Sequence, residues 1–154
     1  MYQLPCLNFP QYEFTVKNDD TGNYFILDTI RNKFLKLTPE EWVRQHIITY
    51  LIKDKNYPKG LMSIEKGLNI NSQQKRYDAV AYNRNAEPLM LIECKAPEVK
   101  ISQQTLDQAV VYNNKLLAKY LLLTNGMKTF CLKSEQNNLV LYDSVPSFED
   151  ACAG

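Results

Sequence analysis

The residues best suited to chemistry in this sequence are two acids and a lysine. Asp78 opens one strand-like segment, and Glu93 and Lys95 close the next, which returns after a short turn. The second segment contains the apolar run 89–92, typical of a strand that is covered on both faces. Side chains alternate along a strand, so Glu93 and Lys95 point to the same face. An antiparallel return brings Asp78 and Glu93 to the same edge of the sheet.

These residue types favour one kind of reaction. Two carboxylates held together repel each other unless a cation lies between them, and oxygen ligands without histidine favour Mg²⁺ or Mn²⁺ over zinc. A lysine on the same face can hold a water or stabilise developing negative charge. Together they suit metal-assisted hydrolysis of a phosphodiester. The alternative is an ordinary Glu93–Lys95 pair on an exposed strand, which the preceding apolar run disfavours.

The surrounding segments predict a first helix that begins at a clear signal. Thr38 can cap it, Pro39 suits its first position, and Glu41 can complete a capping box. Strands are expected at 61–68, 76–83 and 89–96, a second helix from 102 to about 119, and strands at 119–126, 128–133 and 139–142. The polar stretch 69–75 is expected to be a loop.

This order predicts an α/β fold, with a mixed central sheet flanked by helices. The length of 154 residues suits one domain. We divide it into an N-terminal β-hairpin or small meander (1–37), a core (38–133), and a C-terminal strand and tail (134–154). The tail from Asp143 is expected to be a short loop or half-turn of helix.

Composition excludes several other classes. The formal charge of +1 gives no global nucleic-acid footprint, so a DNA-binding surface would have to be local. The four cysteines form no C-x-x-C pair and His46 is the sole histidine, which disfavours zinc. The N-terminus does not resemble a signal peptide, and no stretch is long enough to span a membrane. We therefore expect a cytoplasmic protein with no membrane association.

At these residues the sequence resembles the PD-(D/E)XK nuclease superfamily. Its signature of an acid on the second strand and acid-x-lysine on the third matches Asp78 and Glu93-Cys94-Lys95. The phrase "LIECKAP" is similar to the version in the N-terminal nuclease domain of type I restriction enzyme R subunits and their small relatives. The resemblance implies a restriction-endonuclease-like core of order αβββαβ and a Mg²⁺-dependent deoxyribonuclease, expected to be an endonuclease.

The resemblance also implies a role for each of these residues. Asp78 and Glu93 would bind Mg²⁺ or Mn²⁺, with the backbone carbonyl of Cys94 as a third oxygen, and Lys95 would position or deprotonate the attacking water. The family places a further acid on its first helix, for which this sequence offers Glu40 and Glu41. At about 100° per residue, Glu40 lies nearer the apolar stripe of that helix and Glu41 nearly opposite, whereas the family's spacing fits Glu41 better. Both stay candidates.

Nucleic-acid contacts are expected from the second helix. Gln108 and Tyr112 match the Q-x-x-x-Y element of related nucleases, and Lys115 continues the same side of the helix. This band lies away from the predicted apolar stripe, so we expect it to be free of core packing. The alternative is an ordinary polar helix face.

Four charged residues are weaker candidates. Arg76, Lys75 and Lys100 can reach backbone phosphates, and Glu65 can approach the acids from the first strand, although each also suits a solvated surface.

The sequence contains no G-x-x-x-x-G-K-[ST] phosphate loop. The resemblance therefore implies a stand-alone relative or a nuclease module that works with restriction-modification subunits or a separate helicase or translocase, on DNA. A homodimer is left open. The rival hypothesis is a non-catalytic nucleic-acid-binding or scaffold module that keeps the nuclease fold.

Overall fold

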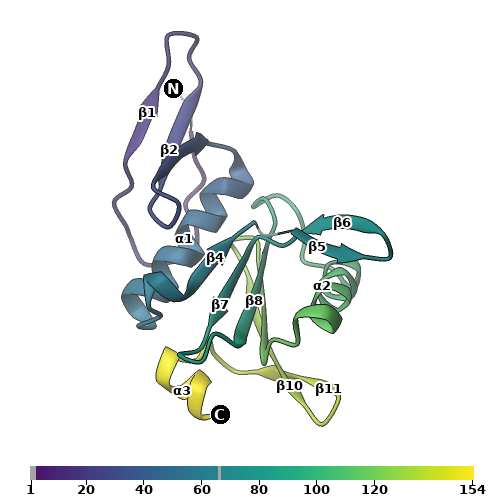
Figure 1. Cartoon of the computed structure of the whole chain (residues 1–154). Coiled ribbons are helices and arrows are strands. Elements are labelled where there is room, and N and C mark those ends of the chain that lie inside the picture. Colours follow the sequence, from purple (N-terminus) through teal and green to yellow (C-terminus); the bar gives the residue numbers. More distant parts are fainter. Residues whose placement is uncertain (1–2, 66) are drawn as a thin grey trace.

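A six-stranded mixed sheet forms the centre of the computed structural model, which describes residues 3–65 and 67–154 (Figure 1). Its strand order is β11-β10-β9-β8-β7-β4, and only the β8–β9 pair is parallel. The strands of this sheet are β4 (Met62–Ile64), β7 (Ala79–Tyr82), β8 (Pro88–Cys94), β9 (Tyr120–Thr124), β10 (Thr129–Glu135) and β11 (Asn138–Tyr142).

Helices cover both faces of this sheet. Helix α1 (Pro39–Asp54) packs Val43, Ile47 and Leu51, all at 0% exposure, on the face that carries Ile92. Helix α2 (Gln103–Leu116) packs on the opposite face. The predicted α/β class with a mixed sheet and flanking helices is confirmed.

The N-terminal region is a three-stranded antiparallel sheet of β1 (Val16–Asn18), β2 (Tyr24–Asp28) and β3 (Lys33–Lys36). The prediction left a hairpin and a meander open, and the meander is the correct form. Aromatic residues before it, including Phe9 and Phe14, pack on Trp42 and His46 of α1. Helix α1 is therefore buried on two sides, and its sequence lacks a single apolar stripe for that reason.

Residues 61–76 differ from the prediction. The expected strand 61–68 is divided into β4 and β5 (Gly67–Ile70), and the expected loop 69–75 contains β6 (Gln73–Arg76). A short 3₁₀ turn (Lys59–Leu61) precedes β4, and Lys66 lies outside the described residues. Strands β5 and β6 form a separate two-stranded antiparallel sheet that extends beside α2 (Figure 1).

The end of the chain is more ordered than predicted. After β11 it forms a short helix, α3 (Phe148–Ala153), where a loop or half-turn was expected. Phe148 is 1% exposed, stacks edge-on against Tyr57, and donates its backbone N–H to the Lys55 carbonyl at 2.8 Å. Within the described residues, no helix has the length and apolar character needed to cross a membrane.

Candidate active site

The antiparallel register of β7 and β8 brings Asp78 and Glu93 together. Ala79 pairs with Ile92. Asp78 lies just before Ala79 and Glu93 just after Ile92, so the two acids lie opposite each other. Both project on the α2 side of the sheet, since side chains alternate and Ile92 packs toward α1. The Asp78 carboxylate also accepts a hydrogen bond from the Cys94 backbone N–H at 2.7 Å, which fixes its position.

Glu93 is buried and Asp78 is half-buried, and neither contacts a cation among the described residues. Glu93 is 6% exposed, and its Oε1 has no hydrogen-bond partner among the described residues. Burial and then the nearby Asp78 carboxylate raise the pKa of Glu93 to about 9. Burial also raises the pKa of Asp78, against the lowering by the Cys94 N–H. At neutral pH this pair holds a proton that a bound cation would displace.

The oxygen atoms at this edge suit a hard divalent cation. They comprise the carboxylates of Asp78 and Glu93 and the backbone carbonyl of Cys94, and the orphaned Glu93 oxygen is an open ligand position. No group of three or more His, Cys, Asp or Glu side chains is placed to hold a metal ion in the described part of the chain. A metal here would therefore keep several waters, as Mg²⁺ commonly does in proteins.

Lys95 follows the acid pair at the edge of a surface groove of about 680 Å³. Its backbone N–H donates to the Thr124 carbonyl at 2.9 Å, which continues the pairing of β8 with β9 beyond the strand end. The groove is also lined by Glu40, from the first turn of α1, and by Gln108 of α2. Helix α1, the end of β8 and helix α2 therefore meet at this groove.

The structure separates the roles of Glu40 and Glu41. Glu40 is exposed in the groove, and partial desolvation followed by the charge of Asp78 raises its pKa, while Lys95 lowers it. Glu41 is 8% exposed, and its carboxylate accepts from the guanidinium of Arg44. Glu41 is buried because the N-terminal sheet covers a second side of α1, and Glu41 lies on that side.

The capping box at the start of α1 is half formed. Thr38 Oγ1 accepts from the Glu41 N–H at 3.1 Å, as predicted. The Glu41 side chain instead accepts from Arg44 and from Gln45 Nε2, the latter at 2.8 Å.

A buried ion network lies behind the site, and the sequence interpretation missed it. Arg44 donates to Glu41 and, at 2.5 Å, to Glu65. Arg31 donates to the same Glu65 at 2.9 Å and to Asp28 at 2.7 Å. Arg44 also lowers the pKa of Asp78. Glu65 is therefore occupied by two arginines, and the suggestion that it joins the acids is not supported by its contacts. The sequence signal for this network was Arg44, which follows Glu40 and Glu41 by one turn of the same helix.

Tyr112 is part of the core, contrary to the prediction that its band is free of packing. It is 6% exposed and packs with Val80 and Leu91 on the sheet. Burial and then the charge of Glu93 raise the pKa of Tyr112. Gln108 is exposed and donates to the Tyr112 hydroxyl at 3.3 Å.

Helix α2 is rotated relative to the predicted stripe. Its buried positions are Thr105, Ala109 and Tyr112, while Leu117 lies just beyond its end and is 77% exposed. The predicted stripe ran through Leu106, Ala109, Val110 and Leu117. Ala109 is fully buried, whereas Tyr112 is buried although it lies outside that stripe.

The remaining candidates are exposed. Lys115 lies in the last turn of α2, about one turn beyond Tyr112. Arg76 ends β6 two residues before Asp78, with Lys75 next to it. Lys100 lines the groove beside Lys95.

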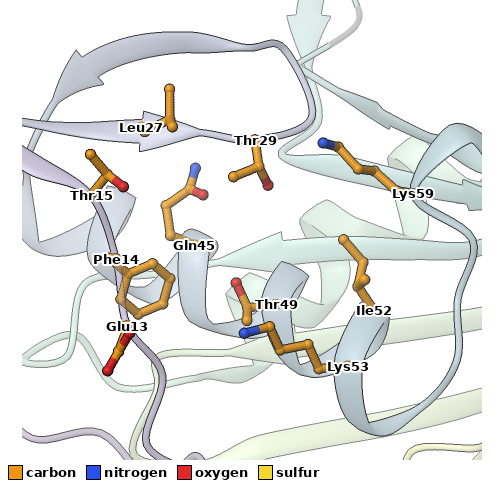
Figure 2. Close-up of a pocket in the computed structure, with 10 residues that line it drawn as sticks. All are labelled: Glu13, Phe14, Thr15, Leu27, Thr29, Gln45, Thr49, Ile52, Lys53 and Lys59. Carbon is orange, nitrogen blue, oxygen red and sulfur yellow. The ribbon is translucent and has the colours of Figure 1, made fainter.

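A second cavity lies away from this site. It has a volume of about 170 Å³ and is enclosed by the segment 13–15, β2 and α1. Figure 2 shows Gln45 and Thr49 of α1 facing Leu27 and Thr29 across it. It contains no paired carboxylates, and we assign it to imperfect packing between α1 and the N-terminal sheet.

Comparison with solved structures places the fold. A fragment of a provisionally assigned HsdR subunit of a type I restriction enzyme from Vibrio vulnificus aligns with a TM-score of 0.57 and 18% identity. The alignment covers 76% of this chain and 25% of the fragment, so this chain spans about a quarter of its length. The fold is HsdR-like.

A second solved structure is a provisionally assigned nuclease of the DUF820 family from Anabaena variabilis. It aligns over 89% of this chain and 93% of its own, at 13% identity and a TM-score of 0.47, which is too weak to support a conclusion. No curated protein matches the sequence. The family model described as type I restriction enzyme R protein N terminus (HSDR_N) matches residues 39–146. That match covers more than half of the sequence, and the chain therefore belongs to the family of type I restriction enzyme R protein N-terminal domains.

Proposed function

We propose that this chain is a Mg²⁺- or Mn²⁺-dependent DNA nuclease of the PD-(D/E)XK type. The observation that carries the proposal is the buried Asp78–Glu93 pair, which has an orphaned carboxyl oxygen and is followed by Lys95 on the same face. The order α1, β4, β7, β8, α2, β9 supports a restriction-endonuclease-like core of αβββαβ form, with β5–β6 inserted.

Each residue at the strand ends has one task in this proposal. Asp78, Glu93 and the Cys94 carbonyl hold the cation, and Asp78 is kept in place by the Cys94 N–H. A bound Mg²⁺ or Mn²⁺ supplies Lewis-acid charge and lowers the pKa of water. Lys95 orients the attacking water from the same face and stabilises negative charge as it develops on the phosphate.

The two acids of α1 have different tasks. Glu40 faces the groove beside Lys95, so it is the acid that supports the site, through a water or directly. Glu41 acts indirectly. It holds Arg44 in place, and the charge of Arg44 lowers the pKa of Asp78. Both candidates therefore keep a role in the proposal: Glu40 supports the metal site from the groove, and Glu41 holds Arg44.

DNA binding is assigned to the elements that border the groove. Gln108 is exposed on its α2 wall and can donate to phosphate, and Tyr112 holds the Gln108 amide through its hydroxyl. Arg76 and Lys115 supply cationic charge on either side. As a family member, the chain is proposed to act in restriction-modification or DNA processing, with restriction subunits or a separate helicase or translocase as partners.

Cleavage of plasmid and linear DNA in Mn²⁺ or Mg²⁺ tests this proposal. We expect Asp78→Ala, Glu93→Ala and Lys95→Ala each to reduce cleavage by at least about a hundredfold. Asp143→Ala, an exposed acid after β11, is the matched control and should cut as the unmodified protein does. Comparing circular with linear substrate separates endonuclease from exonuclease action.

Two results would overturn the proposal. One is full cleavage by Glu93→Ala, which would assign the activity to other residues or to a contaminant. The other is DNA binding by a folded protein that neither binds Mn²⁺ nor cuts DNA, which would establish the rival, a non-catalytic nucleic-acid-binding module.

A further inference from the structure

The β5–β6 hairpin is an insertion whose two ends meet at the candidate active site. It leaves the central sheet after β4 and returns at β7. Its base is closed by a hydrogen bond from the Glu65 N–H to the carbonyl of Asp78 at 3.0 Å. The base of the hairpin is therefore hydrogen-bonded to the backbone of a proposed metal ligand.

The two faces of this ribbon differ in chemistry. Cross-strand partners share a face, so Leu68 with Lys75 and Ile70 with Gln73 point one way. Leu68 and Ile70 pack toward Tyr112 in one cluster, which anchors this inner face against α2.

The outer face carries Gly67 with Arg76 and Asn69 with Gln74. The three side chains on this face are all exposed, and each carries hydrogen-bonding groups. Gly67 leaves open space opposite Arg76, since a Cβ there would meet no atom closer than 3.9 Å. The stretch 67–77 contains no Asp or Glu, so nothing on the ribbon itself repels a polyanion.

We propose that the outer face of the β5–β6 ribbon inserts into a groove of duplex DNA, which would then lie beside the Asp78–Glu93 pair. The major groove, about 12 Å wide, admits a two-stranded β-ribbon, and amide side chains such as those of Asn69 and Gln74 pair with base edges. Arg76 meets the phosphate backbone at the base of the ribbon. This inference rests on the proposed function, because the ligand it names is the DNA that the nuclease would cut.

Charge and position select DNA as the occupant. The outer face carries one cation, Arg76, the inner face carries a second, Lys75, and the residues that lead directly into Asp78 include no carboxylate. A groove-bound ribbon would also hold a phosphate close to the acid pair, because only Tyr77 separates Arg76 from Asp78.

Binding of a fluorescent duplex to the full chain with Mn²⁺ tests the proposal, in a Lys95→Ala background that leaves the DNA uncut. We expect the double variant Asn69→Ala/Gln74→Ala to weaken affinity by roughly tenfold or more. Gln73→Ala is the matched control, since it removes the same side chain from the inner face of the same strand, and its affinity should be unchanged.

A variant that binds DNA more tightly cannot be explained by misfolding, so a gain-of-binding substitution complements the alanine variants. Gln74→Lys should tighten binding and steepen its salt dependence by about one phosphate contact, whereas Gln73→Lys should do so less. Equal affinities for the Asn69→Ala/Gln74→Ala and Gln73→Ala variants overturn the ribbon proposal. Preference for single-stranded over duplex DNA also overturns it.

Titration with Mn²⁺ separates the two proposals. If the protein binds Mn²⁺ and cuts DNA while the ribbon variants bind duplex normally, the ribbon proposal falls and the nuclease proposal stands. If Mn²⁺ does not bind but the outer-face variants still weaken duplex binding, the nuclease proposal falls and the ribbon proposal stands.

Discussion

Two clusters of buried acids lie close together in this protein, and they are compensated in opposite ways. In the first, Asp28 and Glu41 are 1% and 8% exposed, and each contacts an arginine. In the second, Asp78 and Glu93 contact no arginine among the described residues, and one carboxyl oxygen of Glu93 has no partner there.

We interpret the first cluster as structural and the second as the proposed functional site. Buried charges are normally paired, because desolvation of an isolated ion costs far more than a fold can supply. The first cluster obeys this rule and ties the N-terminal sheet to α1. The second breaks it at the point where three elements meet a surface groove, and such exceptions concentrate at sites that bind or react.

The largest effect is expected from removing the cation of the paired cluster. Arg44→Met leaves Glu41 buried without its partner, so we expect the free energy of unfolding to fall by about 3 to 5 kcal/mol in urea denaturation. Adding Glu41→Gln should restore much of the loss. A loss below about 1 kcal/mol would show that the buried pairing is not structural.

Neutralising an acid of the unpaired cluster should have the opposite sign. The pKa of Glu93 rises from 4.5 to about 9 on folding, so the folded protein binds more protons than the unfolded chain in that window, and stability falls as pH rises through it. We expect metal-free Glu93→Gln to be more stable than the unmodified protein by on the order of 2 kcal/mol at pH 7 to 8.

Thermal unfolding at several pH values measures this difference. The advantage of Glu93→Gln should disappear below pH 4.5, where Glu93 is protonated in both states. A destabilised Glu93→Gln protein at pH 8 would contradict the view that this cluster sacrifices stability for function.

A smaller effect is expected where helix α2 borders the functional cluster. Gln108→Ala removes an exposed amide that donates to Tyr112, so we expect DNA affinity or turnover to fall by about 1 kcal/mol, or roughly fivefold. Affinity for Mn²⁺ should be nearly unchanged, and Asn114→Ala on the exposed side of the same helix is the control. Equal DNA affinity and turnover in both variants would return Gln108 to an ordinary polar surface.

The smallest effect is expected from Glu65, which is 36% exposed. Its hydrogen bonds to Arg44 and Arg31 lower its pKa below 4.5, so its contribution is present above pH 4.5 and is lost as pH falls through the lowered pKa. Glu65→Gln should cost about 1 kcal/mol or less at pH 7. The difference from the unmodified protein should vanish once the pH lies below the lowered pKa, and a difference that instead grows toward low pH would contradict this pairing.

The sequence predicted the parts of the fold that depend on local patterns. The Thr38–Pro39 start of α1 has a clear capping signal, and β8 and β9 are clear apolar runs. The meeting of Asp78 with Glu93 followed from antiparallel pairing alone. Their roles in catalysis stay predictions.

Tertiary packing decided the rest. The burial of Glu41 could not be predicted, because a helix buried by two sheets has no single apolar stripe, and Tyr112 was expected outside the core because the predicted stripe of α2 ran through Leu106, Val110 and Leu117. Most of the β5–β6 hairpin, residues 69–75, was predicted to be a loop, since only Leu68 and Ile70 alternate there and the turn at Asn71 and Ser72, both at positive φ, lacks glycine.

Calorimetric titration of the protein with Mn²⁺ at pH 7.5 tests the central claim most directly. We predict one binding site that is lost in Asp78→Asn and kept in Glu65→Gln, with release of about one proton per metal as Glu93 ionises. The proton release should appear as a heat that depends on the ionisation enthalpy of the buffer. No binding by the unmodified protein, or equal binding by Asp78→Asn, would contradict the claim that the unpaired acids form a metal site.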